Sequence, residues 1–290
     1  MKISGFTFVG NALKFDYPVV EAINSILPLC DEVIVAVGNS EDETLALIQS
    51  IDSPKIKIIE TIWDDTMRKD GIVLAMETDK ALAAVSKEAD WCFYIQGDEV
   101  IHEQYLPIIR QAMEDNLHQP EVEGLLFKYQ HFYGSYKYVG DAHWWYRREI
   151  RVIRNTGNVA SYKDAQGFRT LDNQKLTVKL IDAYVYHYGW VKPPEKQKEK
   201  IKDFNKYWHD GEELAGIQAK ANTFDYSQVD SLATFTGTHP QVMQARITRM
   251  DWLFDFDIQE KKLSLKHRLK LWFEQRTGKR FGEYRNYRIL

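Results

Sequence analysis

The sequence has few cysteines, no long apolar run and no glycine-rich phosphate-binding fingerprint, and each absence narrows what the chain can be. Its 290 residues include only Cys30 and Cys92, both in apolar surroundings, so we expect buried thiols and no cysteine metal site. No stretch approaches the roughly 20 apolar residues of a membrane-spanning helix. Residues 1–9 lack the charged start and long apolar stretch of a signal peptide. The expected location is therefore cytoplasmic.

The charges are distributed unevenly along the chain. The composition is 44% hydrophobic and 28% charged, which is ordinary for a globular protein. The net charge is −4, but residues 260–290 carry ten Lys or Arg against three Glu, which makes this tail +7 and the rest of the chain −11. An acidic body argues against a nucleic-acid partner. The basic tail suggests a partner of another kind.

The first hundred residues alternate between short apolar runs and helical patterns. Strands are expected at residues 3–9, 32–37, 55–60 and 91–95, with helices at 18–27, 42–51 and 71–87 between them. This alternation predicts an α/β fold with a mostly parallel, Rossmann-like sheet covered by helices. Ligands bind such sheets at the carboxyl ends of the strands.

After residue 100 the pattern predicts a mixed β/α elaboration and then a helical tail. We expect a helix at 103–117, strands at 124–129, 150–154 and 183–188, and helices at 196–208, 241–250 and 263–275. Residues 132–148 are aromatic and basic, and we expect them to form a loop. We see no linker, so the second half is expected to extend the same domain.

A sheet of this kind usually binds a nucleotide, but the usual phosphate cradles are missing. A single glycine, Gly10, follows the first strand where the dinucleotide fingerprint has three, and no loop ends in Gly-Lys-Ser/Thr. A divalent cation held by carboxylates could neutralise a diphosphate instead. Asp98 and Glu99 follow the fourth strand and would suit Mg²⁺ or Mn²⁺. The alternative is that Asp98 caps the next helix.

Residues 90–99, Asp-Trp-Cys-Phe-Tyr-Ile-Gln-Gly-Asp-Glu, resemble the metal-binding segment of family-2-type glycosyltransferases with the GT-A fold. Residues 69–79 are similar to the Asn-x-Gly-x-x-x-Ala-x-Asn region of that family, and residues 40–44 to its Gly-Ser-Thr-Asp-Gly-Thr turn. Asn11 stands where the family usually has an Asn. The resemblance covers roughly residues 1–100.

The resemblance implies a bacterial enzyme of cell-surface polysaccharide synthesis. Such an enzyme moves a sugar from a nucleotide-diphosphate sugar to a glycan or lipid-linked acceptor, with inversion and with Mn²⁺ or Mg²⁺. The chain would then divide into a nucleotide-sugar-binding half (1–100), an acceptor-binding half (101–193) and a helical C-terminal extension (194–290). Two rivals are a nucleotidyltransferase, for which a glycine-rich triphosphate signature is missing, and a non-catalytic nucleotide or carbohydrate binder.

The resemblance also implies particular site residues. Donor contacts are expected from Phe8, Asn11, Gly38, Asn39, Arg68, Asp70, Gln96 and Gly97. Metal ligands are expected from Asp98, Glu99 and His187. The chain departs from the family where Gln96 replaces the first acid of the metal motif, and where Val37-Gly38 replaces an acidic pair that contacts the nucleobase and ribose.

A carboxylate beyond the metal strand is expected to deprotonate the acceptor. The candidates are Asp164, in a loop-like segment, Glu149, at the start of a strand, and Asp141, in the aromatic loop. Asp164 ranks first, because Glu149 could instead pair with Arg151 and Asp141 could be a turn residue.

Two further segments have open interpretations. Residues 143–148, His-Trp-Trp-Tyr-Arg-Arg, could contact the acceptor or the donor phosphates, or could pack on the core. In the tail, Leu265, Leu269, Trp272 and Arg276 recur at helical spacing among basic residues. This helix could lie on the inner face of an anionic membrane, or Leu269 and Trp272 could dock on the domain. The oligomeric state is not readable from the sequence.

Overall fold

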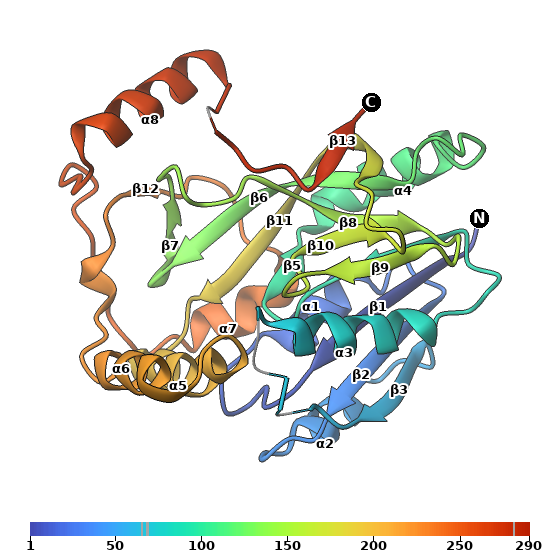
Figure 1. Ribbon diagram of the computed structural model, residues 1–290, viewed down its shortest axis with the longest axis horizontal. Coiled ribbons are helices and arrows are strands. Elements are labelled where there is room, and N and C mark those ends of the chain that lie inside the picture. Colours follow the sequence, from blue (N-terminus) through green and yellow to red (C-terminus); the bar gives the residue numbers. More distant parts are fainter. Residues whose placement is uncertain (65, 68–69, 281) are drawn as a thin grey trace.

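The structure is a computed structural model that describes residues 1–64, 66–67, 70–280 and 282–290. One large twisted sheet runs through the molecule and helices cover both of its faces (Figure 1). The predicted α/β fold class is confirmed. Among the described residues, no helix is long and apolar enough to cross a membrane.

The N-terminal part of the sheet is parallel, as the alternation predicts. Its strands lie in the order β3-β2-β1-β4. The elements are β1 (Ile3–Val9), α1 (Val19–Ile26), β2 (Glu32–Gly38), α2 (Thr44–Gln49), β3 (Ile56–Thr61), α3 (Ile72–Ala83) and β4 (Trp91–Tyr94). Each begins within two residues of its expected position, although α3 ends four residues early.

The buried strands supply two hydrophobic cores, one on each face of the sheet. Successive side chains of a strand point to opposite faces. Val33, Val35 and Val37 of β2 therefore join the core under α1, while Ile34 and Ala36 join the core under α3. Because both faces are covered, most positions in these strands carry apolar side chains, and the strands appear in the sequence as nearly continuous apolar runs.

The second half adds antiparallel pairings to the sheet. Strand β8 runs antiparallel to β4 and β6, and β11 runs parallel to β6 and antiparallel to β5. The elements are β5 (Glu99–Ile101), η1 (Glu103–Tyr105), α4 (Leu106–Asp115), β6 (Gly124–Tyr133), β7 (Ser135–Gly140), β8 (Arg148–Arg154), β9 (Val159–Tyr162), β10 (Gly167–Thr170) and β11 (Leu176–Trp190).

The prediction that residues 132–148 form a loop is wrong in part, because β7 pairs with β6 as a hairpin. Gly134 adopts a left-handed backbone with a φ of 70° at the turn, a conformation that glycine tolerates best. A second hairpin, β9–β10, was also not expected, and its turn carries Asp164.

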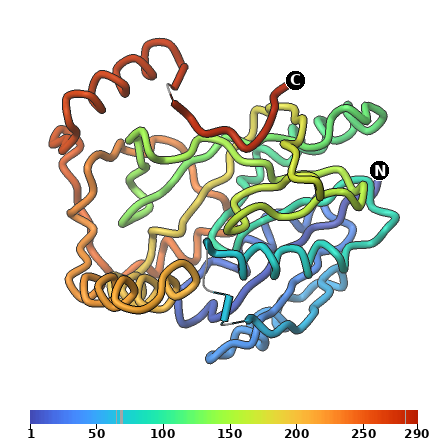
Figure 2. The backbone as a smooth tube through the Cα atoms, viewed as in Figure 1, coloured from blue at the N-terminus to red at the C-terminus, as the bar shows by residue number. Residues whose placement is uncertain are grey.

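The C-terminal extension is mostly helical and returns to the sheet twice. Its elements are α5 (Pro194–Phe204), η2 (Asn205–Tyr207), α6 (Gly211–Ala221), η3 (Tyr226–Gln228), β12 (Leu232–Thr234), η4 (Gln241–Met243), α7 (Gln244–Thr248), α8 (Leu265–Thr277) and β13 (Tyr287–Ile289). Strand β12 pairs with β7, and β13 pairs with β11. The tube in Figure 2 shows α8 at the rim of the molecule before the chain turns back to its C-terminus.

A buried ion pair joins β5 to β8. Glu99 and Arg151 are both fully buried, and the guanidinium Nε and Nη2 atoms each donate to the carboxylate at 2.7 Å. The Tyr129 hydroxyl donates to Glu99 Oε1 at 2.6 Å, and the Gln96 backbone N–H donates to Oε2 at 3.1 Å. Every strong acceptor position of Glu99 therefore has a donor, which is what makes a buried carboxylate tolerable.

Glu99→Gln is expected to lower the free energy of unfolding by about 3–5 kcal/mol, because it leaves the Arg151 charge buried and unpaired. Thermal or denaturant unfolding measures the loss. The matched control is Asp182→Asn at the exposed Lys128–Asp182 pair, whose loss should stay within about 1 kcal/mol. Equal effects of the two variants would contradict a special role for the buried pair.

Candidate functional site

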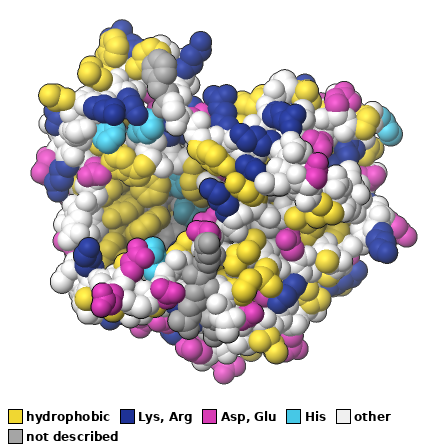
Figure 3. All heavy atoms as spheres, in the orientation of Figure 1, with side chains coloured by type: hydrophobic (Ala, Val, Ile, Leu, Met, Phe, Trp, Pro, Cys, Tyr) yellow, Lys and Arg dark blue, Asp and Glu magenta, His cyan; other side chains and the backbone are white. Residues whose placement is uncertain are grey.

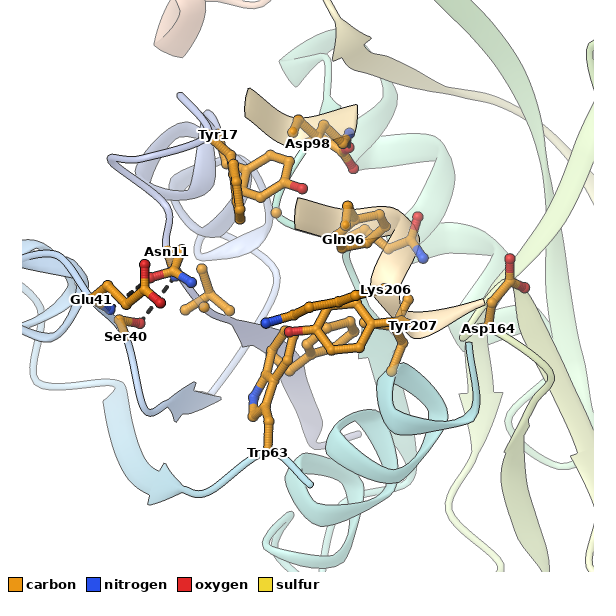
Figure 4. A pocket seen from close by; sticks show the side chains of 18 of the residues that line it. Asn11, Tyr17, Ser40, Glu41, Trp63, Gln96, Asp98, Asp164, Lys206 and Tyr207 are labelled. Carbon is orange, nitrogen blue, oxygen red and sulfur yellow. Dashed lines mark hydrogen bonds and ion pairs between the residues drawn. The ribbon is translucent and has the colours of Figure 1, made fainter. Parts of the chain in front are cut away.

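A cavity of about 500 Å³ opens where the parallel strands end. Residues after β1, β2 and β4 form one side of it, and α5 and η2 of the C-terminal extension cover it (Figure 4). The residues discussed below that line it are Phe8, Asn11, Tyr17, Asn39, Ser40, Glu41, Trp63, Gln96, Gly97, Asp98, Asp164, His187, Lys200, Lys206 and Tyr207. The site therefore lies where the fold class predicts a ligand.

Asn11 ties two of the strand ends together. It has a left-handed backbone with a φ of 52°, which Asn adopts more readily than most residues. Its backbone N–H donates to Ser40 Oγ at 3.0 Å, and its Oδ1 accepts from the Glu41 backbone N–H at 2.7 Å (Figure 4). The turns after β1 and β2 are thus held as one surface.

The Asp98 carboxylate is the charged centre of the cavity. Its Oδ2 lies 3.4 Å from Lys200 Nζ and 3.6 Å from His187 Nε2. Burial alone would raise the pKa of Asp98, but the positive charges of protonated His187 and of Lys200 outweigh it and hold that pKa well below its ordinary value. Asp98 is therefore ionised at neutral pH.

A second histidine, His131, determines how His187 faces Asp98. His131 Nε2 lies 2.7 Å from the Tyr146 carbonyl oxygen, so this nitrogen carries the proton and donates. Burial first, and then His187, lowers the pKa of His131 to about 3, so the ring is neutral and its Nδ1 accepts. Nδ1 lies 3.0 Å from His187 Nδ1, which must therefore donate.

This hydrogen-bond chain leaves His187 Nε2 facing the Asp98 carboxylate. When His187 is protonated, Nε2 carries a proton that faces Asp98; in the neutral ring, Nε2 carries a lone pair opposite a carboxylate oxygen. Two lone pairs repel unless a proton or a metal cation lies between them. A metal-binding histidine commonly donates its other N–H to a supporting group, and His131 is such a group here.

Gly189 leaves the space in which these two side chains approach each other. A Cβ at position 189 would lie 2.6 Å from Asp98 Oδ2 and 2.7 Å from His187 Nε2. Any other residue would therefore push into the gap between carboxylate and imidazole. Glycine is required here because the Asp98 and His187 side chains lie close to its backbone. A left-handed conformation is not the reason, since the backbone at residue 189 is not left-handed.

Asp98 and His187 fit a divalent cation as a partial ligand set. Within the described residues, no group of three or more His, Cys, Asp or Glu side chains could hold a metal ion. Mg²⁺, however, is often held by one or two protein groups together with substrate phosphates and waters. The aimed Nε2 lone pair, the ionised carboxylate and the gap at Gly189 are what such a site needs.

Glu99 does not join Asp98, and its expected role as a metal ligand does not fit the geometry. Its carboxylate turns away from the cavity and binds Arg151 and Tyr129 in the core. Asp98 lies in the turn that precedes β5, in which the Glu99 backbone N–H donates to the Gln96 carbonyl at 3.0 Å. The turn leaves Asp98 facing the cavity, while Glu99, the first residue of β5, faces the core.

One of the three expected base candidates reaches the cavity. Asp164 lines it, and burial raises the pKa of its carboxyl above the ordinary value. Glu149 is buried outside the lining, where burial raises its pKa to about 8 and Gln166 Nε2 donates to it at 2.9 Å. Asp141 pairs with Lys261 at 2.8 Å, also outside the lining. Neither Glu149 nor Asp141 is placed to meet an acceptor in this cavity.

The expected donor contacts divide into three groups. Phe8, Asn11, Asn39, Gln96 and Gly97 line the cavity. Gly38 lies beneath the Trp63 indole, which occupies the position that a side chain at residue 38 would take. Asp70 is exposed and outside the lining, and Arg68 lies outside the described residues.

The aromatic and basic residues 143–148 do not reach the main cavity. Arg147 forms ion pairs with Glu274 and Glu283, at 3.1 and 3.0 Å. Trp145, Tyr146 and Arg147 instead line a second cavity of about 260 Å³ beside α8. The packing interpretation of this segment agrees with the structure.

Sequence reasoning missed His131 and Lys200. His131 is 56 residues from His187 and becomes its neighbour only through the β6–β11 register. Lys200 is 102 residues from Asp98, in a charged helix with no sign of a site. The aromatic residues Phe204, Tyr207 and Trp208, unusual in so charged a segment, were the available signal that this helix covers a cavity.

Neither a protein-family model nor a curated protein matches this sequence. Similar solved structures include S. aureus TarS, at 16% identity and a TM-score of 0.40 over 70% of this chain and 38% of that chain. A second is S. aureus TarS 1–349, at 14% identity and a TM-score of 0.40 over 77% and 68%. A third is glucosyl-3-phosphoglycerate synthase from Mycobacterium tuberculosis with Mn²⁺, UDP and glucosyl-3-phosphoglycerate, at 21% identity and a TM-score of 0.31 over 46% and 45%. Likeness at this level assigns neither activity nor ligands to this chain.

Gly189→Ala is expected to weaken Mn²⁺ binding in the presence of a nucleoside diphosphate. The added Cβ forces Asp98 and His187 apart without changing either ligand, and a loss of roughly 10–100-fold is typical when the support of metal ligands is disturbed. Electron paramagnetic resonance of free Mn²⁺ measures the affinity.

Gly216→Ala is the matched control, because its Cβ would meet no atom within 4 Å and the residue lies in α6, outside the cavity lining. An unchanged Mn²⁺ affinity in a folded Gly189→Ala protein would count against a cation between Asp98 and His187.

Proposed function

We propose that this protein is a GT-A-type glycosyltransferase that moves a sugar from a nucleotide-diphosphate sugar to a glycan or lipid-linked acceptor, with inversion and with the help of Mn²⁺ or Mg²⁺. The observation that carries the proposal is the pair Asp98 and His187, whose facing atoms are 3.6 Å apart in a cavity at the carboxyl ends of parallel strands. Bacterial cell-surface polysaccharide synthesis in the cytoplasm is the process that we expect it to serve.

The diphosphate of the donor would lie beside Asp98. Lys200 Nζ is 3.4 Å from Asp98 Oδ2 and also lines the cavity, as does Lys206. A bound divalent cation would be held by Asp98 and His187 and would stabilise the departing diphosphate. Lys200 supplies positive charge at the same place from the protein itself, which suits a site with only one carboxylate.

The nucleoside end of the donor would lie over β1 and β2. Phe8, Asn11 and Asn39 offer one ring and two amides there. The acidic pair that would contact the base and ribose in the resembling family is absent, and Trp63 covers Gly38 instead. The Trp63 ring lies 5.7 Å from Phe8 and 5.6 Å from Tyr207, measured between centroids. We therefore expect aromatic stacking to contribute most to base binding.

Asp164 is the proposed general base. It lies across the cavity from Asn11, Ser40 and Glu41 (Figure 4), and we expect the acceptor to bind on its side. Its raised pKa brings the carboxyl closer to the operating pH, which favours proton transfer from a hydroxyl. The acceptor hydroxyl would lose its proton to Asp164 as it attacks the anomeric carbon from the face opposite the diphosphate.

A non-catalytic nucleotide or carbohydrate binder is the second candidate. Gln96 places an amide where the family has an acid, and its Nε2 donates to the Ala165 carbonyl at 3.1 Å. This amide adds no negative charge to the metal site. The presence of Gln96 in place of an acid would explain a protein that binds the donor without turning it over.

The proposal is tested with a panel of sugar nucleotides, each with Mn²⁺ or Mg²⁺, by measuring release of the nucleoside diphosphate. Wild-type protein should hydrolyse or transfer from at least one donor. Asp98→Asn should lose binding and turnover. Asp164→Asn should keep donor binding but lose about 10²–10⁴-fold in turnover, the usual contribution of a general base.

Asp182→Asn, at an exposed acid on β11, should leave all of these activities unchanged. Binding without turnover in the wild type would favour the non-catalytic alternative. No binding of any donor, or an unchanged Asp98→Asn variant, would remove the glycosyltransferase proposal.

A further inference from the structure

Helix α8 is a capped helix at the rim of the molecule (Figures 1 and 2). The Ser264 side chain accepts from the His267 backbone N–H at its start. Gly278, with a left-handed φ of 67°, ends it. Caps at both ends satisfy backbone groups that would otherwise be exposed. The helix can therefore keep its shape with packing along one face only.

The inner face of α8 is anchored to the domain. Leu271 is buried against Leu263, Ala142 and Trp145. Glu274 accepts from Arg280 Nε at 2.7 Å and lies 3.1 Å from Arg147 Nη1. The interpretation in which Leu269 and Trp272 dock on the domain is therefore wrong, since Leu271 takes that place.

The outer face of α8 carries three large apolar side chains with nothing packed over them. Leu265, Leu269 and Trp272 are 79%, 68% and 56% exposed. They are four and then three residues apart and so share one face. Figure 3 shows hydrophobic and basic side chains together over this helix. Helix α8 therefore has apolar residues on two opposite faces. One face packs on the domain and the other is exposed.

The charged residues of α8 also differ between its inner and outer faces. Its single acid, Glu274, is on the inner face and neutralised, while Lys266 and Arg276 flank the exposed apolar residues. The Arg276 guanidinium lies 5.5 Å from the centre of the Trp272 ring. The outer face thus combines apolar side chains with positive charge and has no negative charge of its own.

We infer that the outer face of α8 docks on an anionic lipid surface, with Leu265, Leu269 and Trp272 entering the acyl boundary and Lys266 and Arg276 contacting the headgroups. A second copy of the chain fits less well, because a symmetric contact would bring two segments of charge +7 together. The inference is independent of the proposed activity, since no residue of this face lines the main cavity.

Co-sedimentation of the full chain with vesicles tests the inference. The protein should bind vesicles of phosphatidylcholine mixed with phosphatidylglycerol, should not bind pure phosphatidylcholine vesicles, and should bind less as salt is raised. A Leu269→Ser/Trp272→Ser variant and a Lys266→Glu/Arg276→Glu variant should each reduce the bound fraction severalfold with unchanged thermal stability.

Leu253→Ser is the matched control, because Leu253 is a fully exposed leucine outside α8, and its binding should equal that of the wild type. Absent or charge-independent vesicle binding, or an equal loss in Leu253→Ser, would overturn the inference. So would sedimentation equilibrium showing that the free protein is a dimer that Leu269→Ser/Trp272→Ser dissociates.

Discussion

The buried ion pair between Glu99 and Arg151 is the constraint on which the site depends. It places residue 99 in the core with donors on both carboxylate oxygens. Asp98, in the turn just before β5, lines the cavity. The Tyr188 backbone N–H donates to the Asp98 carbonyl at 2.8 Å, which fixes that segment against the end of β11. An acidic pair that looks like two metal ligands in the sequence is one cavity-lining residue, Asp98, and one structural residue, Glu99.

The same strand arrangement brings the histidines into place. In the sheet, His187 is in register with Glu99 on β5 and with His131 on β6. His131 supplies the acceptor that turns the Nε2 of His187 toward Asp98. The geometry of the charged centre thus follows from strand register, one hydrogen-bond chain and the turn before β5 that carries Asp98. The two histidines come from strands, which hold side chains more tightly than loops do.

Residues 1–100 were predictable because β1, β2 and β4 are almost wholly buried and because helices alternate with the strands. The apolar runs of β1, β2 and β4 therefore stand out in the sequence, and so does the position of Asp98 at a strand end. The later hairpins could not be predicted in this way. β7 and β9 are only partly buried and mix polar with apolar residues, so neither forms a continuous apolar run. For the same reason Asp98, His187 and Asp164 were found from local patterns, whereas Lys200 and His131 required the tertiary structure.

The central claim is that Asp98 and His187 together face the diphosphate of a nucleotide donor. A crystal soaked with Mn²⁺ and a panel of nucleoside diphosphates tests it most directly through the anomalous signal of manganese. The account predicts a peak within bonding distance of Asp98 Oδ2 and His187 Nε2, with diphosphate oxygens on its other side and the base beside Trp63. A diphosphate that binds elsewhere, or a cavity that takes up neither manganese nor nucleotide, would contradict it.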